Sequence, residues 1–222
     1  MTLTKNDSLY KKTYFSRITE LKEYAPEAFQ TFFAFNDKAL EEGNLSVKTK
    51  ELIAVAVAHI TGCPYCIDLH VGNAKKNDAD KDEVAEAIFV ATALKAGSAV
   101  AHGVNALNAF DGEGDDELYK ASYFNRLKEF GQLNSDTFKA FAVFDQQATS
   151  AGKLAEKEKE LIAVASAHTT GCAYCIDLHT KNAKKSGASL EEISEAIFVA
   201  TALKAGSAIA HSVNALNAYD QS

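Results

Sequence analysis

The 222-residue sequence has no cluster of basic residues, no long apolar run and no apolar leader at its N-terminus. Acidic residues outnumber basic ones by 30 to 23, for a net charge of -7, so we expect no nucleic-acid partner. No apolar run approaches the roughly 20 residues that span a bilayer, so we expect no membrane segment. Residues 1–7 are polar and unlike a secretory signal, and we therefore expect a cytoplasmic protein.

Runs that alternate between apolar and polar residues and are bounded by hairpin turns are also missing, which argues against β-strands. Helical spacing is found in their place, and we predict an all-α fold. Pro26 suits the first turn of a helix that ends near Gly43. That helix carries four aromatic side chains at roughly helical spacing, Phe29, Phe32, Phe33 and Phe35. We expect these rings to pack in the core; the alternative is that part of the set lines an apolar pocket.

Capping residues predict the next helices. Ser46 suits the N-cap of a helix that runs to about His59 and is broken at Gly62. Pro64 suits the first position of the following helix, with Cys63 as its cap and an end at about Lys76.

Two capping boxes, Asp80 with Glu83 and Ser189 with Glu192, predict the start of a later helix in each half of the chain. We expect that helix to stop at Gly97 or Gly206, with a last alanine-rich helix after it.

The chain is an internal duplication. Sliding the sequence by 109 positions pairs all four cysteines and all six histidines with residues of the same type. Residues 86–102 return as residues 195–211 with a single change. We therefore expect one repeat over residues 1–111 and a second over residues 112–222, packed together and joined by an exposed acidic, glycine-rich junction at residues 110–117.

Cysteine is scarce, and its placement is informative. All four cysteines lie in Thr61-Gly-Cys-Pro-Tyr-Cys-Ile-Asp-Leu-His70 and its second copy at residues 170–179. On a helix, Cys63, Cys66 and His70 share one face. The unpaired N–H groups of the first turn and the helix dipole favour a thiolate there, and His70 can take the proton. Either cysteine can then attack an electrophile while the other closes a disulfide.

Glu51 lies twelve residues before Cys63, on the preceding predicted helix. An antiparallel arrangement of the two helices would bring Glu51 beside His70, where a carboxylate would orient the imidazole and raise its basicity.

The pattern Glu-x11-Cys-x2-Cys-x3-His occurs as Glu51, Cys63, Cys66, His70 and as Glu160, Cys172, Cys175, His179. It resembles the core motif of AhpD-like alkylhydroperoxidases in the carboxymuconolactone decarboxylase superfamily. The motif spans twenty residues per repeat, and the helical framework around it covers most of both halves. In one respect the chain departs from the best-known hydroperoxidase of this family, which has a histidine between its cysteines where this chain has Tyr65 and Tyr174.

The resemblance implies an all-helical enzyme that reduces hydroperoxides with a dithiol. It assigns the attack on the peroxide to Cys66 and Cys175, and the resolving role to Cys63 and Cys172. The helical spacing agrees, since His70 is nearer Cys66. By analogy with thioredoxin, the alternative makes Cys63 the nucleophile.

The resemblance also implies no bound cofactor. An external dithiol, such as a lipoyl group on a protein, would regenerate the thiols. Family members assemble from single repeats as trimers or hexamers, so we expect a homo-oligomer, with a trimer as the first choice and a dimer as the second. The decarboxylases of the superfamily lack the cysteine pair, which speaks against lactone decarboxylation.

Two other functions compete with the peroxidase. Two thiols and an imidazole on one helical face would supply three zinc ligands, with Glu51 or His59 as a fourth. A dithiol can also act as a non-enzymatic redox sensor or interaction module that changes conformation on oxidation.

The remaining histidines and two tyrosines have less specific readings. His59 and its counterpart His168 are expected to cap or pack at the end of their helices rather than take part in catalysis. His102 and His211 are expected to be hydrogen-bonded core or interface groups. Tyr65 and Tyr174 either shield the thiols or donate a hydrogen bond to them.

Overall fold

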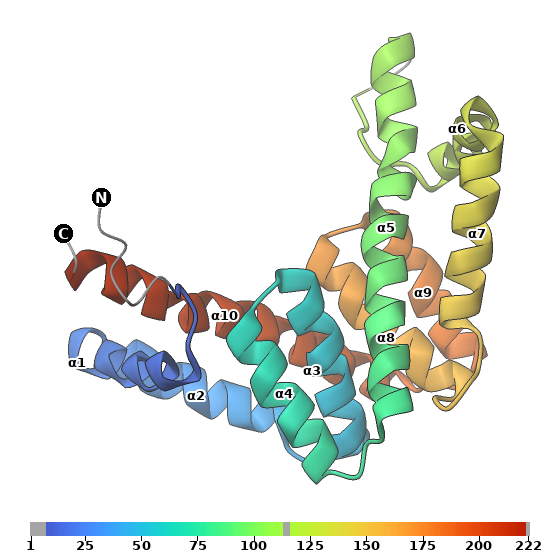
Figure 1. The fold of residues 1–222 in the computed structure, drawn as a ribbon. Helices are drawn as coiled ribbons and strands as arrows, with labels where there is room; N and C mark the ends of the chain where they lie inside the picture. Colours follow the sequence, from blue (N-terminus) through green and yellow to red (C-terminus); the bar gives the residue numbers. More distant parts are fainter. Residues whose placement is uncertain (1–7, 113–115, 221–222) are drawn as a thin grey trace.

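The computed structural model describes residues 8–112 and 116–220, and within these ranges every regular element is helical (Figure 1). The predicted all-α class is therefore confirmed. Residues 1–7, which carry the expectation about a leader, and residues 113–115 of the predicted junction lie outside the described parts. The first half contains η1 (Lys12–Glu20), α1 (Leu21–Tyr24), α2 (Pro26–Leu40), α3 (Val47–Thr61), α4 (Pro64–Lys76) and α5 (Lys81–Asp111). The second half contains η2 (Ala121–Arg126), α6 (Leu127–Leu133), α7 (Ser135–Thr149), α8 (Glu156–Thr170), α9 (Ala173–Lys185) and α10 (Leu190–Asp220).

The local signals around α3 and α4 act as expected. The Ser46 side chain accepts a hydrogen bond from the backbone N–H of Thr49 and caps α3. Gly62 ends α3 with φ of 70°, in the left-handed region that glycine adopts without strain. Helix α4 begins at Pro64, with Cys63 as its cap, and ends at Lys76.

The expected stop at Gly97 and Gly206 is wrong. Helix α5 runs through Gly97 and α10 runs through Gly206, each as one helix of 31 residues. A glycine inside a helix costs only about 1 kcal/mol relative to alanine, which is too little to end a helix that is packed on both sides of it. A Cβ atom would make only ordinary van der Waals contact at either position, 3.7 Å from Phe141 at Gly97 and 3.6 Å from Phe32 at Gly206.

The two halves pack together by exchanging segments. Helices α3 and α8 contact each other at the centre, and both are buried along most of their length. Helix α10 packs on α3 and on η1 and α2 of the first half, while α5 packs on α8 and on α6 and α7 of the second half (Figure 1). Each long helix therefore supports the N-terminal segment of the opposite repeat, and the predicted packing of the halves is confirmed.

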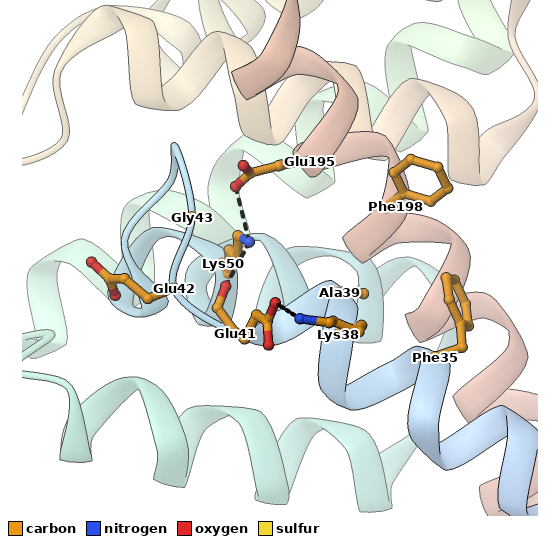
Figure 2. A pocket seen from close by; sticks show the side chains of 9 residues that line it. All are labelled: Phe35, Lys38, Ala39, Glu41, Glu42, Gly43, Lys50, Glu195 and Phe198. Atoms are coloured by element: carbon orange, nitrogen blue, oxygen red, sulfur yellow. Dashed lines mark hydrogen bonds and ion pairs between the residues drawn. The ribbon is translucent and has the colours of Figure 1, made fainter.

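Ion pairs between a buried lysine and a partly buried glutamate connect the two halves across this exchange. The Glu195 carboxylate on α10 lies 2.9 Å from the Lys50 ammonium of α3 (Figure 2). It also accepts hydrogen bonds from the backbone N–H groups of Asn44 and Leu45. A Cβ atom at Gly43 would lie 2.6 Å from this carboxylate, so glycine permits the close approach of the loop. Burial raises the pKa of Glu195, but these hydrogen bonds outweigh it and lower the pKa to about 2.

The other half repeats this arrangement. Glu86 lies 3.1 Å from Lys159 and accepts hydrogen bonds from the backbone N–H groups of Lys153 and Leu154. The pKa of Glu86 is also lowered, since these hydrogen bonds outweigh its burial.

Helices α5 and α10 are long and apolar enough to cross a membrane by length and composition alone. This test averages hydropathy over 18 residues and tolerates up to two charged side chains, whereas an unbroken apolar run tolerates none, so the expectation of no membrane segment stays a prediction. In the structure, 39% of the apolar window of α5 and 44% of that of α10 are buried inside the protein. Core helices of soluble proteins pass the same test, and these two form the core contacts described above.

Candidate active site

Each cysteine pair opens a helix. Cys63 caps α4, and its Sγ accepts a hydrogen bond of 3.2 Å from the backbone N–H of Cys66. Cys172 caps α9 in the same way, with the N–H of Cys175 at 3.2 Å. Both pairs are joined as disulfides, with Cα atoms 5.3 and 5.2 Å apart. The first sulfur of each pair therefore lies where the helix N–H groups and dipole stabilise a negative charge once the pair is reduced.

The two cysteines of a pair differ in access. Cys63 and Cys172 are fully buried, whereas Cys66 and Cys175 are 6% and 7% exposed. The second cysteine of each pair is thus the one that a small electrophile reaches first.

The predicted contact between Glu51 and His70 is present. Nδ1 of His70 lies 2.7 Å from Oε2 of Glu51, and both side chains are buried. A carboxylate at Nδ1 places the Nδ1 proton between the two groups and leaves Nε2 free to accept a proton. In the second repeat, His179 and Glu160 form the same pair at 2.8 Å. The structure thus joins helix α3 to α4, and α8 to α9, at the predicted residues.

An asparagine completes each pair and was not expected. Asn73 donates a hydrogen bond of 3.3 Å from Nδ2 to Oε1 of Glu51, the oxygen that His70 does not use. Asn182 makes the same bond of 3.3 Å to Glu160. The signal was in the sequence, because an asparagine follows each histidine by three residues and so lies on the same helical face.

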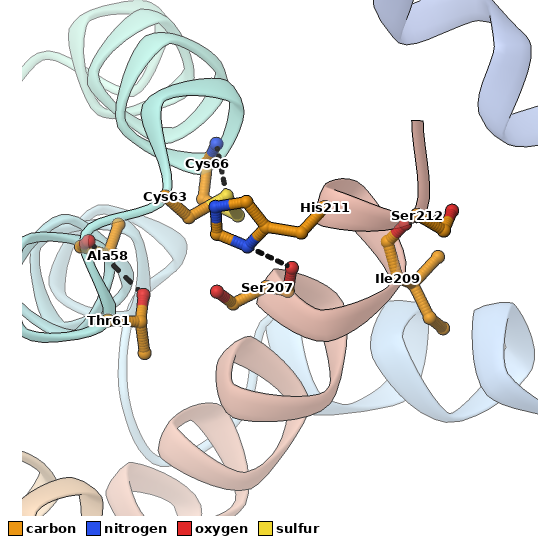
Figure 3. Close-up of a disulfide and its surroundings, with 8 residues drawn as sticks. All are labelled: Ala58, Thr61, Cys63, Cys66, Ser207, Ile209, His211 and Ser212. Atoms are coloured by element: carbon orange, nitrogen blue, oxygen red, sulfur yellow. Dashed lines mark hydrogen bonds between the residues drawn. A yellow bond between two sulfur atoms is a disulfide. The ribbon is translucent and has the colours of Figure 1, made fainter. Parts of the chain in front are cut away.

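The first site is covered by the opposite repeat. Cys63 and Cys66 pack in an apolar cluster with Ala210 and Val213 of α10. Figure 3 shows His211 of the same helix with its ring facing the disulfide. Nδ1 of His211 is 2.9 Å from the carbonyl oxygen of Ser207. The site is therefore built from both halves of the chain.

The second site opens onto a pocket of about 110 Å³. Cys175 and His179 both line it, and its other walls come from α5 and from the segment η2 to α7. One acidic side chain, Asp145 of α7, faces the same space. Burial raises the pKa of Asp145, with a smaller lowering by His179 and a smaller raising by Glu160.

The tyrosines between the cysteines pack against aromatic neighbours. Tyr174 lies 5.3 Å from Phe124 and 5.6 Å from Tyr119, measured between ring centroids. In the part of the chain described, its buried hydroxyl has no hydrogen-bond partner. Burial raises the pKa of Tyr174, with smaller contributions from Tyr119 and Tyr123. This environment favours shielding of the thiols over hydrogen bonding.

The other histidines follow their expected roles only in part. His59 and His168 bond through Nδ1 to carbonyl oxygens of their own helices, Val55 and Val164, each at 2.8 Å. The expectation that His102 is fully hydrogen-bonded is wrong, because its buried Nε2 has no partner among the described residues. The ring of His102 instead lies edge-on to Tyr119, at 6.2 Å.

No group of three or more His, Cys, Asp or Glu side chains in the described ranges is arranged to hold a metal ion. Glu51 is already bonded to His70 and Asn73, and His59 is turned to its own helix. Neither candidate for the fourth zinc ligand is therefore free to take that role.

The phenylalanines of α2 are only partly buried. Phe35 packs against the core and lies 6.5 Å from Phe198 of α10, where both line the pocket of Figure 2. In the second repeat, Phe141, the counterpart of Phe32, lines the pocket beside Cys175. These phenylalanines and their counterparts in the second repeat thus contribute both to core packing and to the walls of pockets.

Several proteins resemble this chain. An uncharacterized protein of the cox locus of Paracoccus denitrificans is 45% identical over 80 residues, which are 36% of this chain and 72% of that protein. A Haemophilus influenzae protein is 40% identical over 91 residues, 41% of this chain and 80% of its own length. Both relatives are about as long as one repeat.

Among solved structures, a protein described as a gamma-carboxymuconolactone decarboxylase subunit of Burkholderia xenovorans LB400 superposes with a TM-score of 0.69 at 20% identity. The match covers 95% of this chain and 96% of that one and shows a shared fold. The sequence profile of the carboxymuconolactone decarboxylase family matches twice, at residues 26–109 and 135–218. With most of its length inside these two matches, the chain belongs to the carboxymuconolactone decarboxylase family as a tandem duplication of the family's domain.

Proposed function

We propose that this protein is a thiol-dependent peroxidase that reduces hydroperoxides through its two dithiol sites. The proposal rests on the buried pair of Glu51 and His70, in which His70 lies one helical turn beyond Cys66. The second half repeats this pair, with His179 and Glu160 2.8 Å apart. A histidine held in this way is suited to take a proton from a neighbouring thiol. The shared pocket wall of Cys175 and His179 supports the same reading.

The reaction follows from these positions. His70 accepts the proton of the Cys66 thiol, and the thiolate attacks the outer oxygen of the hydroperoxide. An S–O bond forms as the O–O bond breaks, which leaves a sulfenic acid and an alcohol. The thiolate of Cys63 then attacks the sulfenic sulfur and closes the disulfide, with release of water. The greater exposure of Cys66 and Cys175 supports their assignment as the attacking thiols.

Turnover then needs two electrons from outside. We propose an external dithiol as the donor, such as a lipoyl group carried by a protein, with no bound cofactor. We also propose that the protein is cytoplasmic and has no nucleic-acid or membrane partner. For its assembly we propose a homo-oligomer, with a trimer as the first choice and a dimer as the second.

The test uses fully reduced protein and a limiting amount of hydroperoxide, with the loss of thiols followed over time. We expect disulfide formation at both sites, and recovery of the thiols on addition of dihydrolipoamide. The variant Cys66→Ser/Cys175→Ser should consume no peroxide through these sites. Unchanged peroxide consumption in that variant would contradict the proposal.

A redox sensor is the second candidate, because segments of the opposite repeat cover each dithiol. The ring of Tyr10 lies 5.6 Å from that of Tyr65 and 6.1 Å from that of His211. A conformational change at the Cys63–Cys66 pair would therefore alter the contacts between the two repeats. Slow peroxide turnover combined with an oxidation-dependent change in assembly, measured by light scattering, would favour this function over the peroxidase.

A further inference from the structure

The two sites carry the same motif but have different surroundings. The pocket beside Cys175 and His179 is lined mainly by apolar side chains, among them Val100, Phe141 and Leu178. A cavity of about 110 Å³ holds a group of a few carbon atoms, since one water occupies roughly 30 Å³ in the liquid.

Asp145 is the acidic group in this pocket. Its carboxyl group makes no hydrogen bond or ion pair within residues 8–112 and 116–220, and it is partly buried. The carboxyl group lies next to Gly97 of α5, with Oδ1 3.9 Å from the position that a Cβ atom would take there. The carboxyl group is thus held over the pocket beside the reacting sulfur and its histidine, without a protein partner of its own.

The first repeat differs at two of the corresponding positions. The residue that corresponds to Asp145 is Asn36, and Phe33 stands where the second repeat has Ala142. The Phe33 ring packs against the apolar cluster that contains Cys63 and Cys66. At Gly206, the counterpart of Gly97, Phe32 approaches and Asn36 does not come within 4 Å.

We propose that the second site is specialised for small organic hydroperoxides and that Asp145 acts there as the proton donor to the departing alkoxide. This inference rests on the proposed peroxidase function. The apolar walls take the organic group, and the carboxyl group of Asp145 faces the peroxide oxygens. The first site, with Asn36 and Phe33, has no acid in this position and less room.

The proton balance closes with the groups present. The Cys175 thiol gives its proton to His179, and the thiolate attacks the outer oxygen, which keeps its hydrogen in the new S–OH group. The O–O bond breaks, and the alkoxide takes a proton from Asp145 to leave as the alcohol. His179 then returns a proton to Asp145. The raised pKa of Asp145 helps, because the carboxyl group keeps its proton to higher pH than an exposed aspartate does.

The experiment isolates the sites in the full chain. Cys63→Ser/Cys66→Ser leaves the second site alone, and Cys172→Ser/Cys175→Ser leaves the first. Each reduced protein is treated with tert-butyl hydroperoxide or hydrogen peroxide, and loss of thiols is followed. We expect the ratio of the rate with tert-butyl hydroperoxide to that with hydrogen peroxide to be at least about 10-fold higher at the second site.

Asp145→Asn, which copies the first repeat, is then added to the protein with only the second site. We expect its rate with tert-butyl hydroperoxide to fall by about 100-fold, the usual scale for loss of a general acid, and its fall in rate at high pH to disappear. Asp136→Asn is the matched control, since Asp136 lies on the same helix with a 98% exposed side chain. Circular dichroism would confirm that each variant is folded.

The inference would be overturned if the ratio of the rate with tert-butyl hydroperoxide to that with hydrogen peroxide were equal at the two isolated sites. An Asp145→Asn variant with an unchanged rate and pH profile would also overturn it. Either result leaves the peroxidase function intact. If neither site is oxidised faster than a free dithiol by either peroxide, the proposed function itself fails, and the inference falls with it.

Discussion

Oε2 of Glu51 lies 2.7 Å from Nδ1 of His70 although the two residues are 19 positions apart and belong to different helices. The same contact recurs between Glu160 and His179. It joins α3 to α4 near the cysteines, and so it links the packing of the core to the chemistry of the thiols. The contact also defines which nitrogen of the imidazole remains available to a thiol proton.

Removing the charge from this pair should slow thiol oxidation by peroxide. We expect Glu51→Gln/Glu160→Gln to react about 100-fold more slowly with hydroperoxide, because a neutral amide no longer stabilises the protonated imidazole. The measurement is the rate of thiol loss in the reduced protein. Glu156→Gln is the control, since Glu156 is exposed on the same helix as Glu160. A full rate in the double variant would show that the histidines act without the carboxylates.

The asparagines should matter less, and in a different way. Asn73→Ala/Asn182→Ala removes one hydrogen bond to each carboxylate, and loss of such a bond is worth about a tenfold change in rate. The measurement is the rate of thiol loss in the reduced protein, with circular dichroism to confirm that the variant is folded. An unchanged rate would show that the asparagines do not help to position the carboxylates.

The ion pair of the partly buried Glu195 with the buried Lys50 should make stability fall in acid. The pKa of Glu195 is lowered from 4.5 to about 2, so its contribution is present above the unfolded pKa and is lost as the pH falls through this interval. We expect Glu195→Gln to cost roughly 3 kcal/mol at pH 7, measured by urea unfolding, and much less at pH 2. Glu191→Gln, an exposed position on the same helix, should change stability little at either pH.

Tyr174→Phe distinguishes shielding from hydrogen bonding. The buried hydroxyl has no partner among the residues described, so its removal should leave the free energy of unfolding unchanged or raise it by up to about 1 kcal/mol. The rate of peroxide reaction at the second site should also stay the same if the ring only covers the sulfur. A large loss of rate would show that the hydroxyl bonds to the reacting thiol or to the peroxide.

The sequence predicted best where the signals were local. Ser46, Cys63 and Pro64 each act within one helical turn, and the structure places the helix starts where these residues require them. The contact between Glu51 and His70 was also predictable, because a short break at Gly62 forces α3 and α4 to turn back on each other.

The exchange of segments was not predictable, and the duplication itself is the reason. Gly97 and Gly206 lie in nearly identical stretches, residues 86–102 and 195–211, so the sequence alone cannot tell which of the two glycines Phe32 packs against. In the structure, Phe32 lies beside Gly206 of the other repeat, and Phe141 lies beside Gly97. The choice is made by contacts such as that of Lys50 with Glu195, 145 positions away. Asp145 was not predictable for a related reason, since the first repeat has Asn36 at the corresponding position and the acid is therefore not part of the duplicated pattern.

Phe33 of the first repeat and Ala142 of the second occupy corresponding positions, and exchanging them should exchange the peroxide preference of the two sites. In a protein with only the second site, Ala142→Phe should introduce, next to the pocket residue Phe141, the ring that packs against the apolar cluster around Cys63 and Cys66 in the first repeat. The rate with tert-butyl hydroperoxide should then fall by about 10-fold, because a pocket of about 110 Å³ does not hold both groups, while the rate with hydrogen peroxide stays within about 2-fold.

In a protein with only the first site, Phe33→Ala should act in the opposite direction and raise the rate with tert-butyl hydroperoxide. Adding Asn36→Asp should raise it further and introduce a fall in rate at high pH, because both features of the second repeat are then present. Phe29→Ala removes a ring of the same helix and serves as the matched control. If Phe33→Ala and Phe29→Ala have the same effect, the gain comes from loosening of α2 and not from space beside Cys66.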